Sequence, residues 1–379
     1  MDGREAKRTA GPSGGVGPAG DVITSRDNRW LKEFRVALRG GVPTAGGAVG
    51  VEGVRLVEEA LSSGCRVEAV LFAESGERHR ERLAPFVGRA EVGFPVLHTT
   101  DRLFEGIADT EHPQGVAALV VPRAWTLEEV LEGRGQRQVA SGEKGVEIRK
   151  SKFEIREEKT QDPLSQTEGG ALPREIGVIA PLIVVLAGVQ DPGNVGTILR
   201  TAAAFGATAA VTAATGQSGT ASPYAPKALR ASAGAALHMP IVSGMALGIL
   251  LTQLKLRGIR TLASCVGEEG QWRVASDEWR ESPREIPHSA DSVRNDVTES
   301  VKRSSEAALA PWEVDWCEAV ALLVGNEGAG LPDDIIHAAE QRIHIPMASR
   351  VESLNAAAAA AVVLYEAYRQ RTRKAATRG

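Results

Sequence analysis

An alternation of apolar runs and helical segments in the second half of the chain constrains the fold more than any other feature. LIVVLAGV, which starts at Leu182, is a β-branched apolar run typical of a strand covered on both faces. Further strand-like runs follow, most of them separated by segments with helical patterning: AAVTAA, MPIV, IRTLASCV, AVALLV and RIHIPM. Such alternation predicts an α/β fold with a mainly parallel sheet, whose ligands bind at the carboxyl ends of the strands.

The chain has 379 residues, enough for two to three domains of roughly 150 residues each. Residues 23–122 form a first block with strand and helix patterns, and residues 181–371 form the parallel-sheet block. In the first block, GVRLVEEALSSG has a helical apolar stripe closed by Gly64, while VEAVLFA, PVLHTT and QGVAALVV are strand-like. We therefore expect a small α/β domain followed by a larger one.

Other segments lack the apolar residues needed for a core. Residues 1–22 are expected to be a Gly-rich flexible tail, residues 123–180 a low-complexity linker, and residues 268–313 a surface insertion within the second block. Their mixed charges, Gly and Ser cannot bury enough apolar surface to offset the cost of ordering the backbone. Residues 372–379 form a short basic tail.

Composition excludes several classes of function. Lys and Arg number 44 and Asp and Glu 48, a formal net charge of −4, so any polyanion must bind a local basic patch. The three cysteines lie far apart without a CxxC pair, and the seven histidines show no HxH or HxxxH spacing; we expect no metal site. Because no apolar run approaches the roughly 20 residues of a membrane span, we expect a cytoplasmic protein with no membrane partner.

Three loops that follow predicted strands carry polar residues among glycines. The first starts at Gln190, contains Asn194 and leads into a helix with Arg200. Asn194 is equally consistent with a turn or helix-cap residue. Arg200 lies among apolar residues, which indicates a buried or interfacial purpose for its charge.

The second loop runs from Gly325 to Pro332, where Glu327 either accepts from a ligand or caps the helix that follows. The third loop ends at Asn355 and enters a helix that begins with a run of alanines, residues 356–361. Ser353 or Asn355 suits the helix cap. A helix with so little side-chain volume is expected to have another backbone pressed against it.

Together these loops, in this order and spacing, resemble the SpoU/TrmH family of RNA ribose 2′-O-methyltransferases. The matching strings are DPGNVGTILRTAAAFGA, LLVGNEGAGLP and RIHIPMASRVESLNAAAAAAVVLYE, and SPYAPKALRASAGAALHMPI is also similar. The first block resembles the N-terminal substrate domain of many members through SRDNRWLKE, VEGVRLVEEAL and TEHPQGVAALVV. The resemblance implies a deep trefoil knot in the C-terminal domain and a small N-terminal αβα RNA-binding domain.

The resemblance also implies that S-adenosylmethionine binds in the knot. Carried over residue by residue, the family's cofactor positions are Gly325, Ile345 and Leu354, with Leu323, Val324, Asn326 and Met347 as neighbours. This chemistry is reasonable, because glycine lets the main chain approach the adenosine and the apolar residues offer faces for a flat ring.

The implied reaction is methyl transfer to a ribose 2′-hydroxyl, with catalytic positions at Asn194, Arg200, Glu327, Ser353 and Asn355. A guanidinium is too weakly acidic to serve as a resting base. We therefore expect Arg200 to hold an RNA phosphate and to stabilise the alkoxide-like transition state. The other polar residues would orient the ribose, Arg200 and the loops.

The N-terminal domain favours 23S rRNA as the substrate. Alternatives are a tRNA ribose methyltransferase and a non-catalytic protein for RNA binding or ribosome assembly, against which the five retained polar residues argue. A nucleotide-dependent oxidoreductase is disfavoured because GxGxxG is absent.

We expect a homodimer through the knotted domain. RNA contacts are expected from the first block or from the basic C-terminal residues, although both groups also suit a solvated helix face. The first group is Arg26, Asn28, Arg29, Lys32, Arg35 and Arg39, and the second is Arg369, Arg371, Arg373, Lys374 and Arg378.

Overall fold

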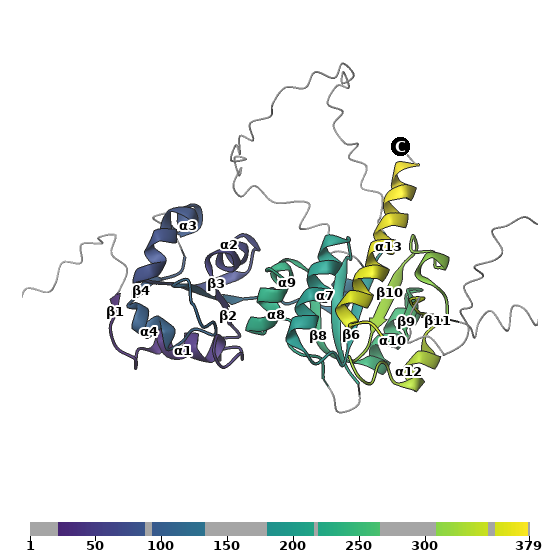
Figure 1. The fold of residues 1–379 in the computed structure, drawn as a ribbon, viewed down its shortest axis with the longest axis horizontal. Helices are drawn as coiled ribbons and strands as arrows, with labels where there is room; N and C mark the ends of the chain where they lie inside the picture. Colours follow the sequence, from purple (N-terminus) through teal and green to yellow (C-terminus); the bar gives the residue numbers. More distant parts are fainter. Residues whose placement is uncertain are drawn as a thin grey trace, which may run out of the picture. The chain divides into compact units, whose positions relative to one another are not determined.

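The computed structural model describes residues 22–87, 93–132, 180–215, 219–265, 308–347 and 353–377. The chain divides into two compact units, Met1–Pro122 and Arg123–Gly379, which are described separately (Figure 1). In the described residues, no helix is long and apolar enough to cross a membrane. The same residues contain no cluster of His, Cys, Asp and Glu side chains that could hold a metal ion.

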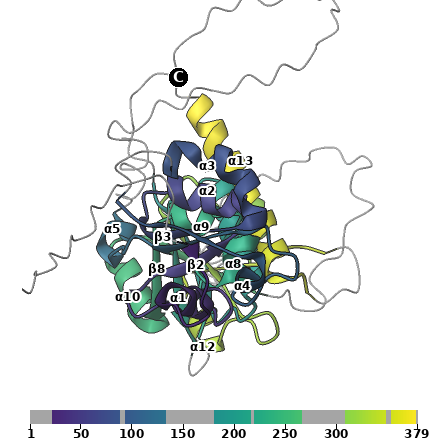
Figure 2. The ribbon, with the colours of Figure 1, turned by 90° about the vertical axis from the view of Figure 1, so that its left-hand side faces the viewer.

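The first unit is a three-layer αβα structure. Its elements are β1 (Val22–Ile23), α1 (Arg29–Ala37), β2 (Val49–Glu52), α2 (Val54–Ser62), β3 (Arg66–Ala73), a 3-10 helix (Glu74–His79), α3 (Arg80–Val87), β4 (Val96–Thr99), α4 (Asp101–Glu105) and β5 (Val116–Val121). The sheet order is β1-β4-β3-β5-β2, with β5 antiparallel to both of its neighbours. Helices α1 and α4 cover one face and α2 and α3 the other (Figure 2). The expected small α/β domain is confirmed.

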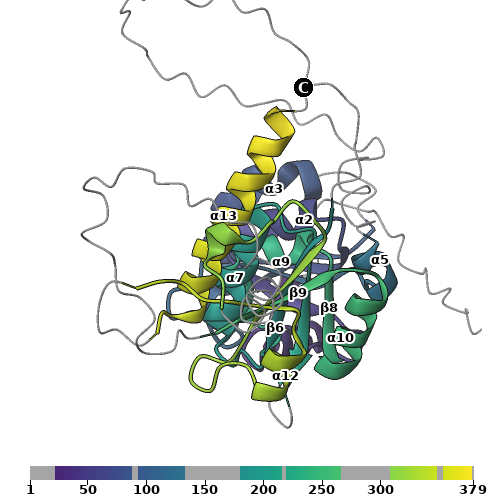
Figure 3. The same ribbon diagram turned by 90° about the vertical axis from the view of Figure 1, so that its right-hand side faces the viewer.

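The second unit is built on a sheet in which every pair of neighbouring strands is parallel. Its elements are α5 (Leu127–Leu131), β6 (Leu182–Ala187), α7 (Pro192–Ala204), β7 (Ala209–Ala214), α8 (Pro226–Ala231), α9 (Ala235–His238), β8 (Ile241–Ala246), α10 (Leu247–Leu256), β9 (Arg260–Ser264), a 3-10 helix (Pro311–Glu313), β10 (Val320–Val324), α12 (Asp333–Ala338), β11 (Gln341–Ile343) and α13 (Ala356–Ala376). The sheet order is β11-β9-β10-β6-β7-β8. Helices α7 and α13 lie on one face, and α5, α10 and α12 on the other (Figure 3). The predicted parallel sheet is confirmed, whereas the trefoil knot stays a prediction.

Three expected boundaries differ from the structure. The start of the expected linker forms α5, whose Val130 and Leu131 are buried in the core of the second unit; residues 133–179 lie outside the described residues. The end of the expected insertion is also ordered, because Leu309 pairs with Ile343 and Ala310 is fully buried. Helix α13 continues to Ala376, into the expected basic tail.

Arg371 ties α13 to the central strands. Its guanidinium donates to the backbone carbonyls of Ala180 (2.6 Å), Trp316 (2.7 Å) and Glu318 (2.8 Å), which lie just before β6 and β10. Burial lowers the pKa of this side chain. Arg371 is therefore committed to the fold and is not free to contact RNA, unlike the expectation for the C-terminal basic residues.

Candidate active site

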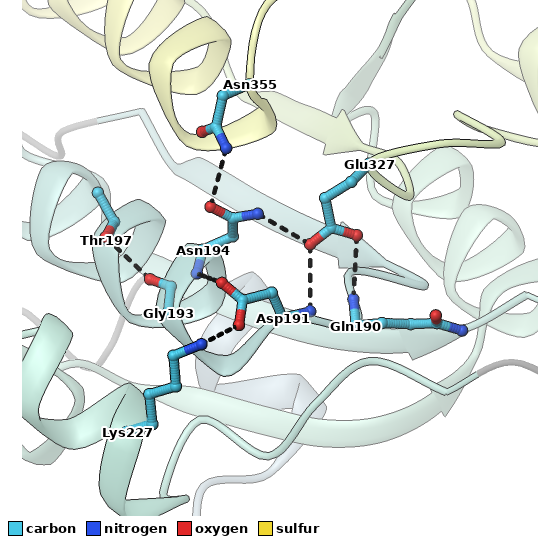
Figure 4. A network of polar contacts seen from close by, with 8 residues as sticks. All are labelled: Gln190, Asp191, Gly193, Asn194, Thr197, Lys227, Glu327 and Asn355. Atoms are coloured by element: carbon cyan, nitrogen blue, oxygen red, sulfur yellow. Dashed lines mark hydrogen bonds and ion pairs between the residues drawn. The ribbon is translucent and has the colours of Figure 1, made fainter.

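The loops after β6 and β10 meet because these parallel strands are neighbours in register, with Leu186 opposite Val324. The carboxylate of Glu327, in the second loop, accepts from the backbone N–H groups of Gln190 and Asp191 at 3.2 Å each. It also accepts from the side-chain amide of Asn194 at 3.0 Å (Figure 4). One carboxylate thus joins the first loop to the second.

Asn194 extends this connection to the third loop. Its Oδ1 accepts from the Nδ2 of Asn355 at 3.1 Å, as Figure 4 shows. The Oδ1 of Asn355 in turn caps α13 by accepting from the N–H groups of Ala357 and Ala358. The expected capping role of Asn355 is confirmed, and three loops distant in sequence are held together through Glu327, Asn194 and Asn355.

The surroundings of Glu327 keep it ionised. Burial by itself raises the pKa of this carboxyl, but hydrogen bonds from Asn194 and from nearby backbone N–H groups together outweigh it. The pKa of Glu327 consequently lies below its ordinary value. Because its oxygens already accept these hydrogen bonds, Glu327 is better suited to hold the loops than to remove a proton.

A cavity of about 480 Å³ opens beside this network, within the range of roughly 300–1,000 Å³ common for small-molecule sites. Most of the expected cofactor residues line it: Val324, Gly325, Asn326, Ile345, Met347 and Leu354. Ser353 and Glu327 also reach its wall. These expected cofactor residues and two of the expected catalytic residues therefore surround a single cavity.

Leu323 does not line this cavity. Side chains alternate along a strand, and Leu322 and Val324 face the cavity. Leu323 is fully buried on the opposite face, in a core cluster with Val185 and Ala263. Its expected place as a cofactor neighbour is wrong for its side chain.

Gly325 is required by the second loop itself. A Cβ at this position would lie 2.5 Å from the backbone of both Gly330 and Leu331. The loop folds back this closely because Asn326 and Gly330 exchange two backbone hydrogen bonds of 3.0 Å. Asn326 also donates from Nδ2 to the carbonyl of Gly188 at 2.9 Å, so it organises the loop as well as lining the cavity.

The alanine run at the start of α13 has two roles: it lines the cavity, and it lets α13 pack closely against α7. Ala356, Ala359 and Ala360 line the cavity, and α13 packs beside α7 (Figure 1). Small side chains allow both the close helix packing and the open space. The sequence predicted that another backbone packs closely against this helix, and the contact between α13 and α7 agrees with that prediction.

Arg200 is exposed, and among the described residues it has no hydrogen-bond or ion-pair partner. The expectation of a buried role is wrong, because Ile198 and Leu199 turn into the core while Arg200 occupies the outer surface of α7. An interfacial role remains compatible with this position. Ser353 is also exposed, and its expected capping role is taken by Asn355.

Sequence reasoning missed several residues of the site. Ser264 and Cys265, at the carboxyl end of β9, and Asp333 and Ile336 of α12 line the cavity. The signal that could have found Cys265 is its place after a strand that neighbours β10.

Comparison with known proteins identifies the family. Residues 181–271 and 265–365 match the model of the SpoU rRNA Methylase family. The chain belongs to the SpoU rRNA methylase family. We refer to residues 181–365 as the SpoU domain. Residues 45–118, in the first unit, match an MRM3-like substrate binding domain.

Similar proteins support this membership. The 23S rRNA (guanosine(2553)-2′-O)-methyltransferase RlmP of Bacillus subtilis is 24% identical over 90% of this chain and 97% of that protein. An uncharacterized tRNA/rRNA methyltransferase of Synechocystis is 32% identical over 50% of this chain, which spans about half of that protein's length (54%). The solved structure of an AdoMet-bound rRNA methyltransferase from Sinorhizobium meliloti is 22% identical, with a TM-score of 0.61 over 92% of this chain and 97% of that one. This last likeness establishes the shared fold.

The contacts of Glu327 in the SpoU domain predict a pH-dependent contribution to stability. Glu327→Gln should lower the free energy of unfolding by about 1 kcal/mol at neutral pH, because an amide cannot accept every hydrogen bond that the carboxylate accepts. Since the folded-state pKa of Glu327 is depressed, its contribution is present above the unfolded-state pKa and is lost as pH falls through the folded-state pKa. Urea unfolding over a pH series measures this difference.

Glu340→Gln is the matched control for this substitution, because Glu340 is exposed and its carboxylate has no hydrogen-bond or ion-pair partner in the described part of the chain. This substitution should change the free energy of unfolding at neutral pH by less than about 0.5 kcal/mol. A difference between wild type and Glu327→Gln that grows as pH falls would contradict the assignment.

Proposed function

We propose that this chain transfers the methyl group of S-adenosylmethionine to a ribose 2′-hydroxyl of 23S rRNA. The observation that carries the proposal is the convergence of Asn194, Glu327 and Asn355 beside the cavity of the SpoU domain. The relative RlmP, named for this reaction on 23S rRNA, aligns with nearly the whole chain.

The cavity fits the proposed cofactor. Ile345, Met347 and Leu354 supply apolar walls for an adenine ring, while the loop after Gly325 presents backbone groups to polar atoms. When bound, S-adenosylmethionine supplies a methyl group activated by its sulfonium. The solved relative from Sinorhizobium meliloti is described as AdoMet-bound, in agreement with this assignment.

Gly325→Ala tests the cofactor site. The added Cβ should displace the backbone at Gly330 and Leu331 and reshape the cavity wall, so we expect the Kd for S-adenosylmethionine to rise about 10-fold or more. Isothermal titration calorimetry measures it. The control is Gly328→Ala, where the nearest atom to a new Cβ lies at 3.6 Å, an ordinary contact. Equal affinity of wild type and Gly325→Ala would contradict the placement.

Arg200 is the residue we assign to charge stabilisation. Its exposed guanidinium, unpaired within the described residues, is available to an RNA phosphate. It would stabilise negative charge on the 2′-oxygen as the bond to the methyl carbon forms. The hydroxyl proton passes to water or to the RNA phosphate. Glu327, Ser353 and Asn355 would orient the ribose and the loops.

The activity and the role of Arg200 are tested together. Purified protein with radiolabelled S-adenosylmethionine and unmodified 23S rRNA should place the label on a ribose, located by reverse-transcription stops. Arg200→Ala should lower the rate at least about 100-fold, with cofactor affinity retained. The control Arg257→Ala changes the exposed residue directly after α10, whose side chain bonds only Gln253 among the described residues, and it should keep the wild-type rate.

Label on a base, or full activity of Arg200→Ala, would contradict the proposal. Label on tRNA in place of rRNA would favour the tRNA alternative, which the naming of the Synechocystis relative leaves open. Binding of 23S rRNA without any label would favour the non-catalytic alternative. The alignment of RlmP, named as a 23S rRNA methyltransferase, with 90% of this chain favours rRNA.

The first unit is proposed to contact the RNA. Three segments of this unit resemble a substrate domain: residues 25–33, 51–61 and 110–121. They meet at the rim of the sheet where β1 and β2 end and β5 begins. A hydrogen bond joins the second segment to the third at this rim, because the Oε1 of Gln114 accepts from the N–H of Val54 at 2.9 Å. The candidate contacts Arg26 and Lys32 are exposed, and Arg35 is half-buried.

Two of these expected RNA contacts also have partners within the protein. The Oδ1 of Asn28 caps α1 by accepting from the N–H of Trp30 at 2.8 Å. Lys32 lies 3.5 Å from Asp27, an exposed ion pair that an RNA phosphate can replace at little cost. The proposed contact surface therefore rests mainly on Arg26, Lys32 and Arg35.

We also propose that the chain is a homodimer through the SpoU domain. Helix α13 exposes Val362 (45%), Tyr365 (55%) and Tyr368 (42%) on one side. Phe205, at the end of α7, packs against both tyrosines with ring centroids 5.6 and 5.8 Å apart. This aromatic face is formed by α7, which contains Arg200, and by α13, which Asn355 caps. A second copy bound to these two helices would lie beside the candidate site.

A cytoplasmic location stays a prediction.

Tyr365→Glu should convert the dimer to a monomer, because it places a charge within the aromatic face. Size-exclusion chromatography with light scattering at micromolar concentration measures the mass. Ile249→Glu alters an equally exposed apolar residue on α10 and should leave the mass unchanged. A wild-type protein that is already monomeric would refute the dimer.

A further inference from the structure

Lys227 reaches the site network from a separate helix. It lies in the first turn of α8, and its Nζ forms an ion pair with the Oδ1 of Asp191. The other carboxylate oxygen of Asp191 accepts from the N–H of Asn194 at 3.2 Å, which caps α7. The N–H of Asp191 donates to Glu327. Asp191 therefore connects Lys227 to both residues that join the loops (Figure 4).

The backbone at Gly193 is shaped around this ion pair. A Cβ at Gly193 would lie 2.8 Å from the Oδ2 of Asp191 and 3.2 Å from the Cε of Lys227. The lysine stem thus passes close to the glycine, and the ends of both side chains would have to shift to admit a Cβ there. The absence of a side chain at Gly193 therefore leaves room for the Lys227–Asp191 contact, an observation separate from the hydrogen bonds.

We infer that Lys227 is a positioning residue for methyl transfer, acting through Asp191 to hold the turn that carries Asn194. The inference rests on the proposed function. With Lys227 bound at Oδ1, the carboxylate is oriented so that Oδ2 faces the N–H of Asn194. The side-chain amide of Asn194 is then held between Glu327 and Asn355.

Charge supports the same arrangement. The hydrogen bond from Lys227 is the largest influence on the pKa of Asp191 and lowers it. The carboxylate therefore stays ionised at the start of α7, where a negative charge is favourable. Without the lysine, Oδ1 loses its cation and the carboxylate is free to rotate away from Asn194.

A purely structural salt bridge makes a different prediction. The side chain of Lys227 is 60% exposed, and exposed ion pairs contribute little to global stability. Loss of Lys227 should therefore leave the melting temperature almost unchanged, while a misplaced Asn194 should slow the reaction, because small errors in positioning reduce rates strongly.

Steady-state kinetics test the inference. Lys227→Met should lower kcat on the order of 10-fold and change the KM for RNA and the Kd for S-adenosylmethionine less than about twofold. Lys227→Arg keeps a cation within reach of Asp191 and should restore most of the rate. Lys255→Met, on the exposed side of α10, is the matched control and should behave as wild type. An unchanged kcat, or a change confined to the KM for RNA, would overturn the inference.

Hydrogen exchange separates this inference from the proposed function. In Lys227→Met, amides of residues 190–197 should exchange faster than in the wild type and in Lys255→Met, because the N–H of Asn194 loses its oriented acceptor. This readout requires no catalysis. A wild-type enzyme without methyl transfer would refute the proposed function, whereas unchanged exchange in Lys227→Met would overturn the role of Lys227.

Discussion

The side-chain amide of Asn194 is the contact on which the site depends. It donates to Glu327 and accepts from Asn355, residues 133 and 161 positions away in sequence. An amide suits this place because it offers a donor and an acceptor on the same rigid group. The parallel register of β6 and β10 brings the first two loops together, and the amide then fixes the third loop beside them.

Much of the fold could be predicted because the core strands carry their own signal. LIVVLA and VALLV are continuous apolar runs, and β6 and β10 are fully buried on both faces. Helix–strand alternation then implied a parallel sheet, which placed the loops containing Asn194 and Glu327 at one edge. The glycines and capping residues of those loops left ligand-binding and structural roles open, and the resemblance to the SpoU/TrmH family supplied the candidate site residues.

The remaining features depend on tertiary packing that no local pattern encodes. Leu323 and Val324 are equally apolar, and only the pleat decides which one faces the cavity. Arg200 is surrounded by core residues in sequence, but the helical turn places it on the outer surface. Lys227 pairs with Asp191 across 36 positions. The five-residue helix α5 is too short to show a period, so its packing onto the second core was hidden in a polar segment.

A crystal structure of the protein with bound S-adenosylmethionine most directly tests whether three distant loops form one site. We expect electron density for the cofactor in the cavity lined by Gly325, Ile345 and Leu354, with Asn194 still bonded to Glu327 and Asn355. Density at another surface, or a cofactor-bound state in which Asn194 has separated from both Glu327 and Asn355, would contradict this expectation.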